Sequence, residues 1–187
     1  MRLLVLSSFG WYALLFSIMQ QSIAYKFKVV KVQSYQYPRF ELFRLIGMTL
    51  FTVAVITIGD TFVANHRAIR YAGLLVIMLG FALSTWSQYS LGKNWVPGIG
   101  LHINHKLIIT GPFRHIRHPM YSGMLLSAIG ICLATLNGWY GASVLVFCGA
   151  YALRAPIEDI KLRQQFGSEY AAYADQTGAI FPKFRKH

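Results

Sequence analysis

Ionisable side chains gather in two parts of the chain, and their types suit the binding of a charged ligand. Four of the six histidines lie between residues 102 and 118, and four of the six acidic residues follow residue 157. Histidine can carry a proton near neutral pH, and carboxylates pair with cationic groups. A protein that needed only to pack would have no reason to gather such groups. We therefore expect a site formed by residues 92–118 and 154–187.

The first segment combines a turn with the start of a helix. Gly111-Pro112 predicts the turn, and Pro119 suits the first turn of a helix, where its missing N–H is not needed. The N-terminal amides of that helix can receive an anionic group of a ligand. His118 and Tyr121 are three residues apart and can face one pocket. The alternative is a belt of Arg, His and Tyr side chains at the lipid headgroups.

The second segment carries Arg154 and Glu158, which are four residues apart. They share a face if the helix continues past Pro156. The two residues form either an ordinary ion pair or a ligand clamp at the membrane edge. The aromatic residues that follow, from Phe166 to Phe184, either close over a ligand or lie on headgroups.

The histidines do not show the pattern of a metal site. His102 and His105, like His115 and His118, have i,i+3 spacing, but no cysteine or carboxylate lies in the same loop. A metal site usually needs about three or four ligands of suitable geometry. Gly98-Ile99-Gly100 lacks the preceding strand of a nucleotide-binding loop. We predict no metal site.

The composition indicates which elements must position these groups. The 187 residues include 18 Lys and Arg against 6 Asp and Glu, a formal charge of +12, yet only 13% are charged and 55% are hydrophobic. A soluble domain usually has about 25% charged residues, and disorder requires low hydrophobicity. Nucleic-acid binding does not explain long uncharged stretches, and two cysteines in apolar segments do not make a disulfide framework. A small membrane protein fits.

Gaps between charged residues locate the membrane spans. A spanning helix needs about 20 apolar residues, and the charge-poor stretches predict five helices, at 3–24, 44–64, 71–91, 119–136 and 139–156. Asn137-Gly138 divides the last stretch into a tight hairpin of two short helices. Arg2, the apolar run and Ser22-Ile23-Ala24 also resemble a cleavable signal peptide, but the run is long for one.

Basic residues set the expected orientation. With five spans, residues 25–44, 92–118 and 154–187 share one side and hold five, four and six Lys and Arg residues, against three on the other side. The richer side is the cytoplasmic one. We therefore expect an all-α, multi-pass membrane protein with the C-terminus and the site in the cytoplasm. Residues 1–187 form one domain, with three helices in 1–91 and the site in 92–187.

Together these segments resemble the isoprenylcysteine carboxyl methyltransferase family of integral-membrane enzymes, and especially its small five-helix prokaryotic members. The resemblance runs from Leu91 to Pro182, and the first two helices contribute only hydropathy. It rests on Arg-His-Pro-x-Tyr at 117–121, on Arg154 followed by Glu158 and Asp159, and on Phe-Gly-x-Glu-Tyr-x-x-Tyr at 166–173.

The resemblance implies a site for S-adenosyl-L-methionine, with S-adenosyl-L-homocysteine as the product. The implied cofactor-binding residues are His105, Lys106, Leu107, Ile108, Phe113, His118, Pro119, Met120, Tyr121 and Glu158. Arg154 corresponds to the arginine associated with the acceptor, as a catalytic and substrate-binding residue. Phe113 stands where many relatives have Tyr, and Asp159 stands where a second Glu is usual, which bears on the cofactor contacts at both positions.

Elementary chemistry leaves three functions open. A carboxylate acceptor of pKa about 4 is already ionised near neutral pH, so O-methylation of an isoprenylcysteine-like acceptor needs alignment and an Arg rather than a base. N- or S-methylation of a lipid amine or small thiol is the alternative, and an amine would need His118 or His115 as a base. The third function is a non-enzymatic lipid-binding protein without cofactor affinity. The expected partners are a lipophilic or lipidated acceptor and membrane lipids, with no nucleic acid and no obligate protein partner.

Overall fold

The computed structural model describes residues 33–35, 67–95, 99–101, 106–136 and 138–183. In chain order the elements are β1 (Gln33–Tyr35), α3 (Arg67–Leu91), the 3-10 helix η1 (Gly92–Asn94), β2 (Ile99–Leu101), the 3-10 helix η2 (Gly111–Arg114), α4 (Pro119–Thr135), α5 (Gly138–Phe166) and α6 (Ser168–Gln176). The predicted helices 3–24 and 44–64 and the predicted cofactor residue His105 lie outside the described residues.

The described residues fall into two compact units. The smaller unit contains β1, η1 and β2, and its two strands pair antiparallel. In this unit the main-chain N–H of Lys106 donates to Asn94 Oδ1 at 2.9 Å. The larger unit contains η2, α4, α5, α6 and α3 up to Ser90. The all-α expectation is confirmed for the larger unit. The short sheet of β1 and β2 in the smaller unit was not predicted. Its strands are far apart in the sequence, so no local pattern indicates that they pair. The single-domain organisation stays a prediction.

Helix α3 buries polar residues and exposes apolar ones. Ser84, Ser87 and Gln88 are fully buried, whereas Leu75 and Met78 are 57% and 67% exposed. This distribution reverses that of a soluble protein and is typical of a helix whose outer face meets lipid. Among the described helices, Arg67–Asn94 is the one long and apolar enough to cross a membrane, with a mean hydropathy of 1.7. The predicted helix 71–91 is therefore present and begins slightly earlier, at Arg67.

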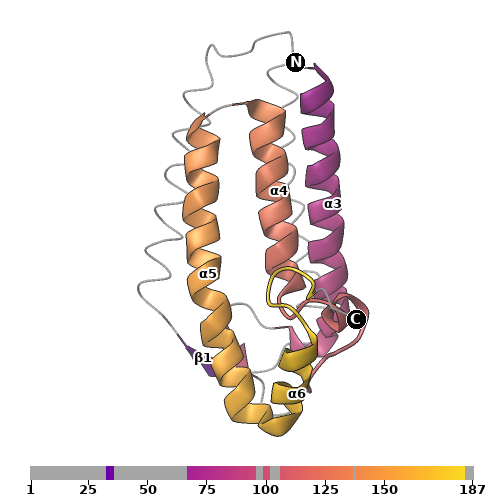
Figure 1. Cartoon of the computed structure of the whole chain (residues 1–187), viewed down its shortest axis with the longest axis vertical. Helices are drawn as coiled ribbons and strands as arrows, with labels where there is room; N and C mark the ends of the chain where they lie inside the picture. Colours follow the sequence, from indigo (N-terminus) through magenta and orange to yellow (C-terminus); the bar gives the residue numbers. More distant parts are fainter. Residues whose placement is uncertain (1–32, 36–66, 96–98, 102–105, 137, 184–187) are drawn as a thin grey trace. The chain divides into compact units, whose positions relative to one another are not determined.

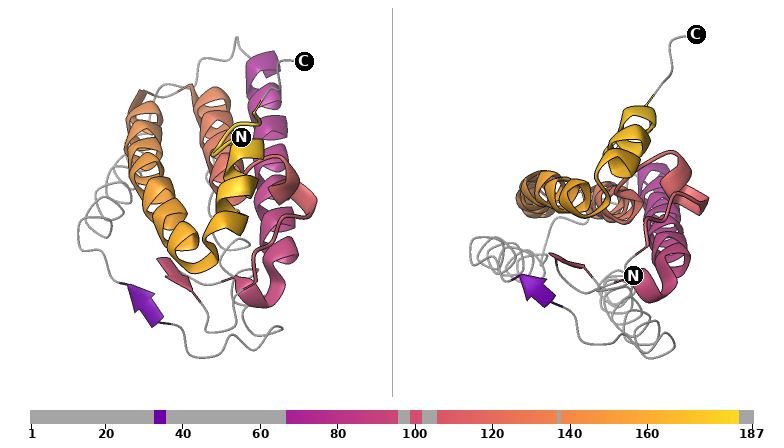
Figure 2. Two further views of the ribbon diagram at one scale, coloured as in Figure 1. Left: turned by 60° about the horizontal axis from the view of Figure 1, so that its bottom comes forward. Right: turned by 90° about the horizontal axis from the view of Figure 1, so that it is seen from below.

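Small residues allow α3 and α4 to approach until their backbones touch. Figure 1 shows the two helices side by side, and Figure 2 shows the same from two other directions. A Cβ built on Gly130 would lie 2.6 Å from the main-chain nitrogen of Ile77, and one on Gly73 would lie 2.7 Å from the carbonyl oxygen of Gly130. Ser84 Oγ donates across the same seam to the carbonyl of Met120 at 3.3 Å. Close packing of small residues is how helices associate in lipid.

Helices α4 and α5 form the predicted hairpin, but α5 is longer than predicted. Leu136 ends α4 in the left-handed conformation, with φ of 52°, and α5 begins at Gly138. Helix α5 then runs for 29 residues to Phe166, so the prediction of a short helix ending near residue 156 is wrong. Pro156 removes the N–H that would bond to the carbonyl of Ala152 and crowds that carbonyl, yet the helix continues past it.

The C-terminal segment turns back onto the start of α4. Gly167, with φ of 55°, separates α5 from α6, and α6 lies beside the end of α5 (Figure 1). The main-chain N–H groups of Arg117 and His118 then donate to the carbonyls of Gly178 and Ala179 at 2.8 and 2.9 Å. This contact brings the residues before α4 together with the C-terminal tail, as the sequence predicted.

One added methyl group at Gly130 should force α3 and α4 apart. We expect Gly130→Ala to lower the free energy of unfolding by about 1–3 kcal/mol, the usual cost of overpacking. Gly149→Ala is the matched control, because a Cβ built on Gly149 has no atom of the described residues within 4 Å apart from its own stretch of helix. Thermal unfolding of both variants in the same detergent measures the difference. Equal unfolding temperatures would contradict the close seam.

Candidate functional site

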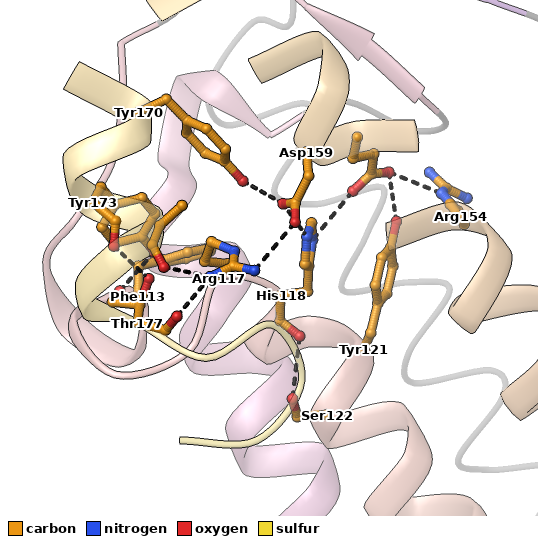
Figure 3. Close-up of polar contacts among 12 residues, drawn as sticks. Phe113, Arg117, His118, Tyr121, Ser122, Arg154, Asp159, Tyr170, Tyr173 and Thr177 are labelled. Atoms are coloured by element: carbon orange, nitrogen blue, oxygen red, sulfur yellow. Dashed lines mark hydrogen bonds and ion pairs between the residues drawn. The ribbon is translucent and has the colours of Figure 1, made fainter. Parts of the chain in front are cut away.

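His118 lies between two carboxylates where α4 begins and α5 passes it (Figure 3). Its Nε2 is 2.8 Å from Asp159 Oδ1, its Nδ1 is 3.5 Å from Glu158 Oε2, and its side chain is only 5% exposed. Ionised carboxylates accept hydrogen bonds and cannot donate them. Burial alone would lower the pKa of His118, but the hydrogen bonds to Asp159 and Glu158 outweigh it and raise the pKa. A ring nitrogen facing each carboxylate, together with the raised pKa, favours the protonated form of His118 as the link between the two acids.

Glu158 is held by three side chains. Its Oε1 accepts from the hydroxyl of Tyr121 at 2.5 Å and from Nε of Arg154 at 2.9 Å, while Oε2 faces His118. Burial raises the pKa of Glu158, but the hydrogen bond with His118 and the charge of Arg154 lower it further than burial raises it. Glu158 therefore stays ionised. Its pairing with Arg154 confirms that the helix continues past Pro156 and places both residues on one face.

Aromatic rings fix the orientation of this group. The rings of His118 and Tyr121 stack with centroids 5.5 Å apart and an interplanar angle of 9°. Tyr121 also packs on Tyr151 at 4.7 Å, and the guanidinium of Arg154 lies 5.6 Å from the centre of the Tyr121 ring. That separation is within the range of a cation–π contact. The guanidinium of Arg154 is thus held by the Tyr121 ring and by the carboxylate of Glu158.

Asp159 connects the cluster to the C-terminal segment. It accepts hydrogen bonds from His118, from the hydroxyl of Tyr170, and from Nη2 of Arg117 at 3.3 Å. Burial raises the pKa of Asp159, but the hydrogen bonds from His118 and Tyr170 lower it to about 2. Burial and the hydrogen bond to Asp159 together raise the pKa of Tyr170. Asp159 is therefore ionised near neutral pH, and it joins the start of α4 to α6.

Arg117 fastens the end of α6 to the same cluster. Its Nη1 donates to the carbonyls of Ala174 and Thr177 at 2.9 and 2.6 Å. The carbonyls at the C-terminal end of a helix favour a cation. Close by, the hydroxyl of Tyr173 donates to the carbonyl of Phe113 at 2.7 Å. Hydrogen bonds therefore hold the C-terminal segment against residues 111–118.

The structure brings four of the predicted site residues into one cluster: His118, Tyr121, Arg154 and Glu158. Of two others, Pro119 follows His118 and is fully buried in the first turn of α4, and Phe113 is buried in η2, where its carbonyl accepts from Tyr173.

The remaining predicted residues are not joined to the cluster. Met120 faces α3, where its Sδ accepts from Nε2 of Gln88 at 3.5 Å. Leu107 and Ile108 are half-buried before η2, and Lys106 is exposed in the smaller unit. Within the described residues, no group of three or more His, Cys, Asp or Glu is arranged to hold a metal ion.

The residues that link the cluster to the tail were missed in the sequence: Arg117, Tyr170, Tyr173 and Thr177. A signal was available, because Arg117 belongs to the motif at 117–121 and both tyrosines belong to the motif at 166–173. Their partners include main-chain carbonyls, which have no signature in a sequence.

Comparison with known proteins connects this arrangement to methyltransferases. The chain is 33% identical over 117 residues to a probable protein-S-isoprenylcysteine O-methyltransferase of Oryza sativa subsp. indica, covering 61% of each protein. It is 27% identical over 191 residues to the protein-S-isoprenylcysteine O-methyltransferase of Homo sapiens, covering 95% of this chain and 66% of the human protein. The chain thus spans about two thirds of the length of these curated relatives.

A solved structure shares the fold. The eukaryotic intramembrane Ras methyltransferase named isoprenylcysteine carboxyl methyltransferase superposes with a TM-score of 0.67 at 22% identity, covering 97% of this chain and 67% of that one. This chain therefore shares the helical fold of that intramembrane enzyme. Residues 68–169 match the family described as phospholipid methyltransferase. The similarity therefore begins before Leu91, the residue at which the sequence motifs placed its start. Since this match covers more than half of the residues, the chain belongs to the phospholipid methyltransferase family.

Proposed function

We propose that this protein transfers a methyl group from S-adenosyl-L-methionine to the carboxylate of a lipophilic, isoprenylcysteine-like acceptor on the cytoplasmic side of a membrane. The observation that carries the proposal is the cluster of Arg154, Glu158, Tyr121 and His118 at the start of α4. The names of the relatives, which are protein-S-isoprenylcysteine O-methyltransferases, support the choice of acceptor.

The polar and apolar groups at the cluster fit this cofactor. An ionised carboxylate offers about four acceptor positions, and among the described residues Oε2 of Glu158 has only its 3.5 Å contact with His118. Oε2 can therefore accept from an ammonium or a ribose hydroxyl. The N-terminal amides of α4 suit a carboxylate, and Phe113 offers apolar surface to adenine. When bound, the cofactor supplies the reactive methyl group, while the protein supplies position and electrostatics.

Arg154 is suited to orient the acceptor. It follows the charge-free stretch of α5, and its guanidinium is held by Glu158 and by the Tyr121 ring. A carboxylate acceptor is an anion near neutral pH, because its pKa is about 4. The reaction then depends on alignment rather than on removal of a proton.

A lipid amine is the second candidate acceptor, favoured by the family description as phospholipid methyltransferase. An amine of pKa about 10 must lose a proton first. His118 does not suit that task, because both of its ring nitrogens face carboxylates and its pKa is raised. Glu158 and Asp159 are weak bases, because their pKa values are lowered. The geometry therefore favours the carboxylate.

Methyl transfer from a radiolabelled donor tests the function. We expect the purified protein to form a base-labile methyl ester on an N-acetylated farnesylcysteine, and none on the same compound with its carboxyl group converted to an amide. Phosphatidylethanolamine serves as the amine acceptor in a parallel reaction. Labelling of the amine without labelling of farnesylcysteine would move the proposal to N-methylation. Cofactor binding should be measured alongside, since its absence would favour a non-enzymatic lipid-binding protein.

Glu158→Gln should weaken cofactor binding. The substitution keeps the size of the side chain and a hydrogen-bond acceptor but removes the charge. Losing a bond to a charged group costs about 1.5–3 kcal/mol, or roughly ten- to a hundredfold in affinity. Glu169→Gln is the matched control, because Glu169 is an exposed acid on α6. Calorimetric titration with S-adenosylmethionine measures both variants. An unchanged affinity for Glu158→Gln would remove Glu158 from the cofactor site.

Arg154→Lys should separate the acceptor from the cofactor. Lysine keeps the positive charge beside Glu158 but loses the planar fork that aligns a carboxylate. We expect most of the cofactor affinity to remain and single-turnover methyl transfer to fall by about a hundredfold, the usual effect of a misplacement of about 1 Å. Equal turnover by the Lys variant would reject the acceptor role. Matched losses of affinity and rate would instead place Arg154 in the cofactor site.

A further inference from the structure

A recess on another face of α5 adjoins the cluster of Arg154 and Glu158 and shares Asp159 and Arg117 with the contacts around His118. Its volume is about 530 Å³, and small-molecule sites measure about 300–1,000 Å³. On the α5 side it is lined by Ala152, Ala155, Pro156 and Ile160, and across from them by Ala179 and Ile180. None of these belongs to the residues that the family resemblance implies for the cofactor, so the recess is a second candidate site.

The charged side chains of the recess make it cationic. They are Arg117, Asp159 and Arg163. Asp159 already accepts bonds from Arg117, His118 and Tyr170. The guanidinium of Arg163, exposed near the end of α5, has no ion pair or side-chain hydrogen bond with another described residue. Guanidinium groups bind phosphate oxygens through paired N–H bonds. The recess therefore suits an anion.

The wall beyond the arginines is apolar and continues outward. Ile160 lines the recess and is 58% exposed, and Phe181, next to the lining residue Ile180, is 70% exposed. Large exposed apolar side chains beside a site mark contact with lipid or with a partner. A ligand that is anionic at one end and apolar at the other satisfies both parts of the recess.

The level of the recess along α5 matches a membrane surface. No formally charged residue occurs from His118 to Leu153, and the charged part of α5 begins at Arg154. His118 bonds to Asp159, which places the start of α4 at the same level. Basic residues at this level of a bilayer meet lipid headgroups.

We propose that the recess between α5 and residues 179–181 binds an anionic phospholipid. Arg163 contacts the phosphate, and an acyl chain lies along Ile160 and Phe181. Inorganic phosphate would satisfy the guanidinium group but would leave the apolar wall uncovered, which is why the structure favours a lipid. The proposal goes beyond methyl transfer and does not depend on the identity of the acceptor.

Native mass spectrometry of protein released from vesicles of phosphatidylcholine and phosphatidylglycerol tests this site. We expect the unsubstituted protein to retain phosphatidylglycerol in preference, and Arg163→Gln to retain about five- to tenfold less. Arg67→Gln is the matched control, because Arg67 is an exposed arginine at the start of α3. Ala152→Phe should also reduce retention, because it fills the recess from an exposed position without a change of charge.

Three results would overturn the proposal. The first is equal retention of phosphatidylglycerol by the unsubstituted protein, Arg163→Gln and Ala152→Phe. The second is displacement of phosphatidylglycerol by an equal concentration of inorganic phosphate, which would make the recess a site for a free anion. The third is a loss of S-adenosylmethionine affinity in Arg163→Gln that equals its loss of lipid, which would join the recess to the cofactor site.

Discussion

The buried cation at His118 is the interaction on which the described site depends. One of its ring nitrogens faces Asp159 and the other faces Glu158, so the start of α4 is tied to α5 beyond Pro156. A buried charge is tolerated only when it is paired and hydrogen-bonded. Loss of either carboxylate would leave the imidazolium incompletely paired, and the other side chains of the site are bonded to those same two acids. Glu158 holds Arg154 and Tyr121, while Asp159 holds Arg117 and Tyr170.

The helices make this pairing possible by fixing the level at which α4 begins. The seam of small residues sets α4 against α3, and the hairpin sets α5 against α4. Helix α5 must then continue past Pro156 to bring Glu158 and Asp159 level with His118. Apart from His118, which both acids face, Glu158 and Asp159 have different partners, because successive residues on a helix face different directions. Glu158 therefore belongs to the proposed reaction site, and Asp159 belongs to the contacts that hold α6 in place.

The sequence predicted the parts of this arrangement that depend on local pattern. Gaps between charges identified α3, α4 and the hairpin at Asn137-Gly138, and the spacing of Arg154 and Glu158 predicted a shared face. The full length of α5 was not predicted, because the apolar pattern ends at Leu153 and Pro156 follows. The helix nevertheless continues through that proline to Phe166. The orientation of Met120 toward Gln88 depends on the rotation of α4 against α3, which motif spacing does not define.

The central claim is that His118 is a cation between Glu158 and Asp159. Nitrogen NMR of the protein with isotope-labelled histidine rings tests it most directly, with His118→Gln to assign the signal. We predict that both ring nitrogens carry protons at neutral pH and that the ring loses a proton at a higher pH than an ordinary histidine, whose pKa is about 6.5. A neutral ring with one unprotonated nitrogen at pH 7 would contradict the account.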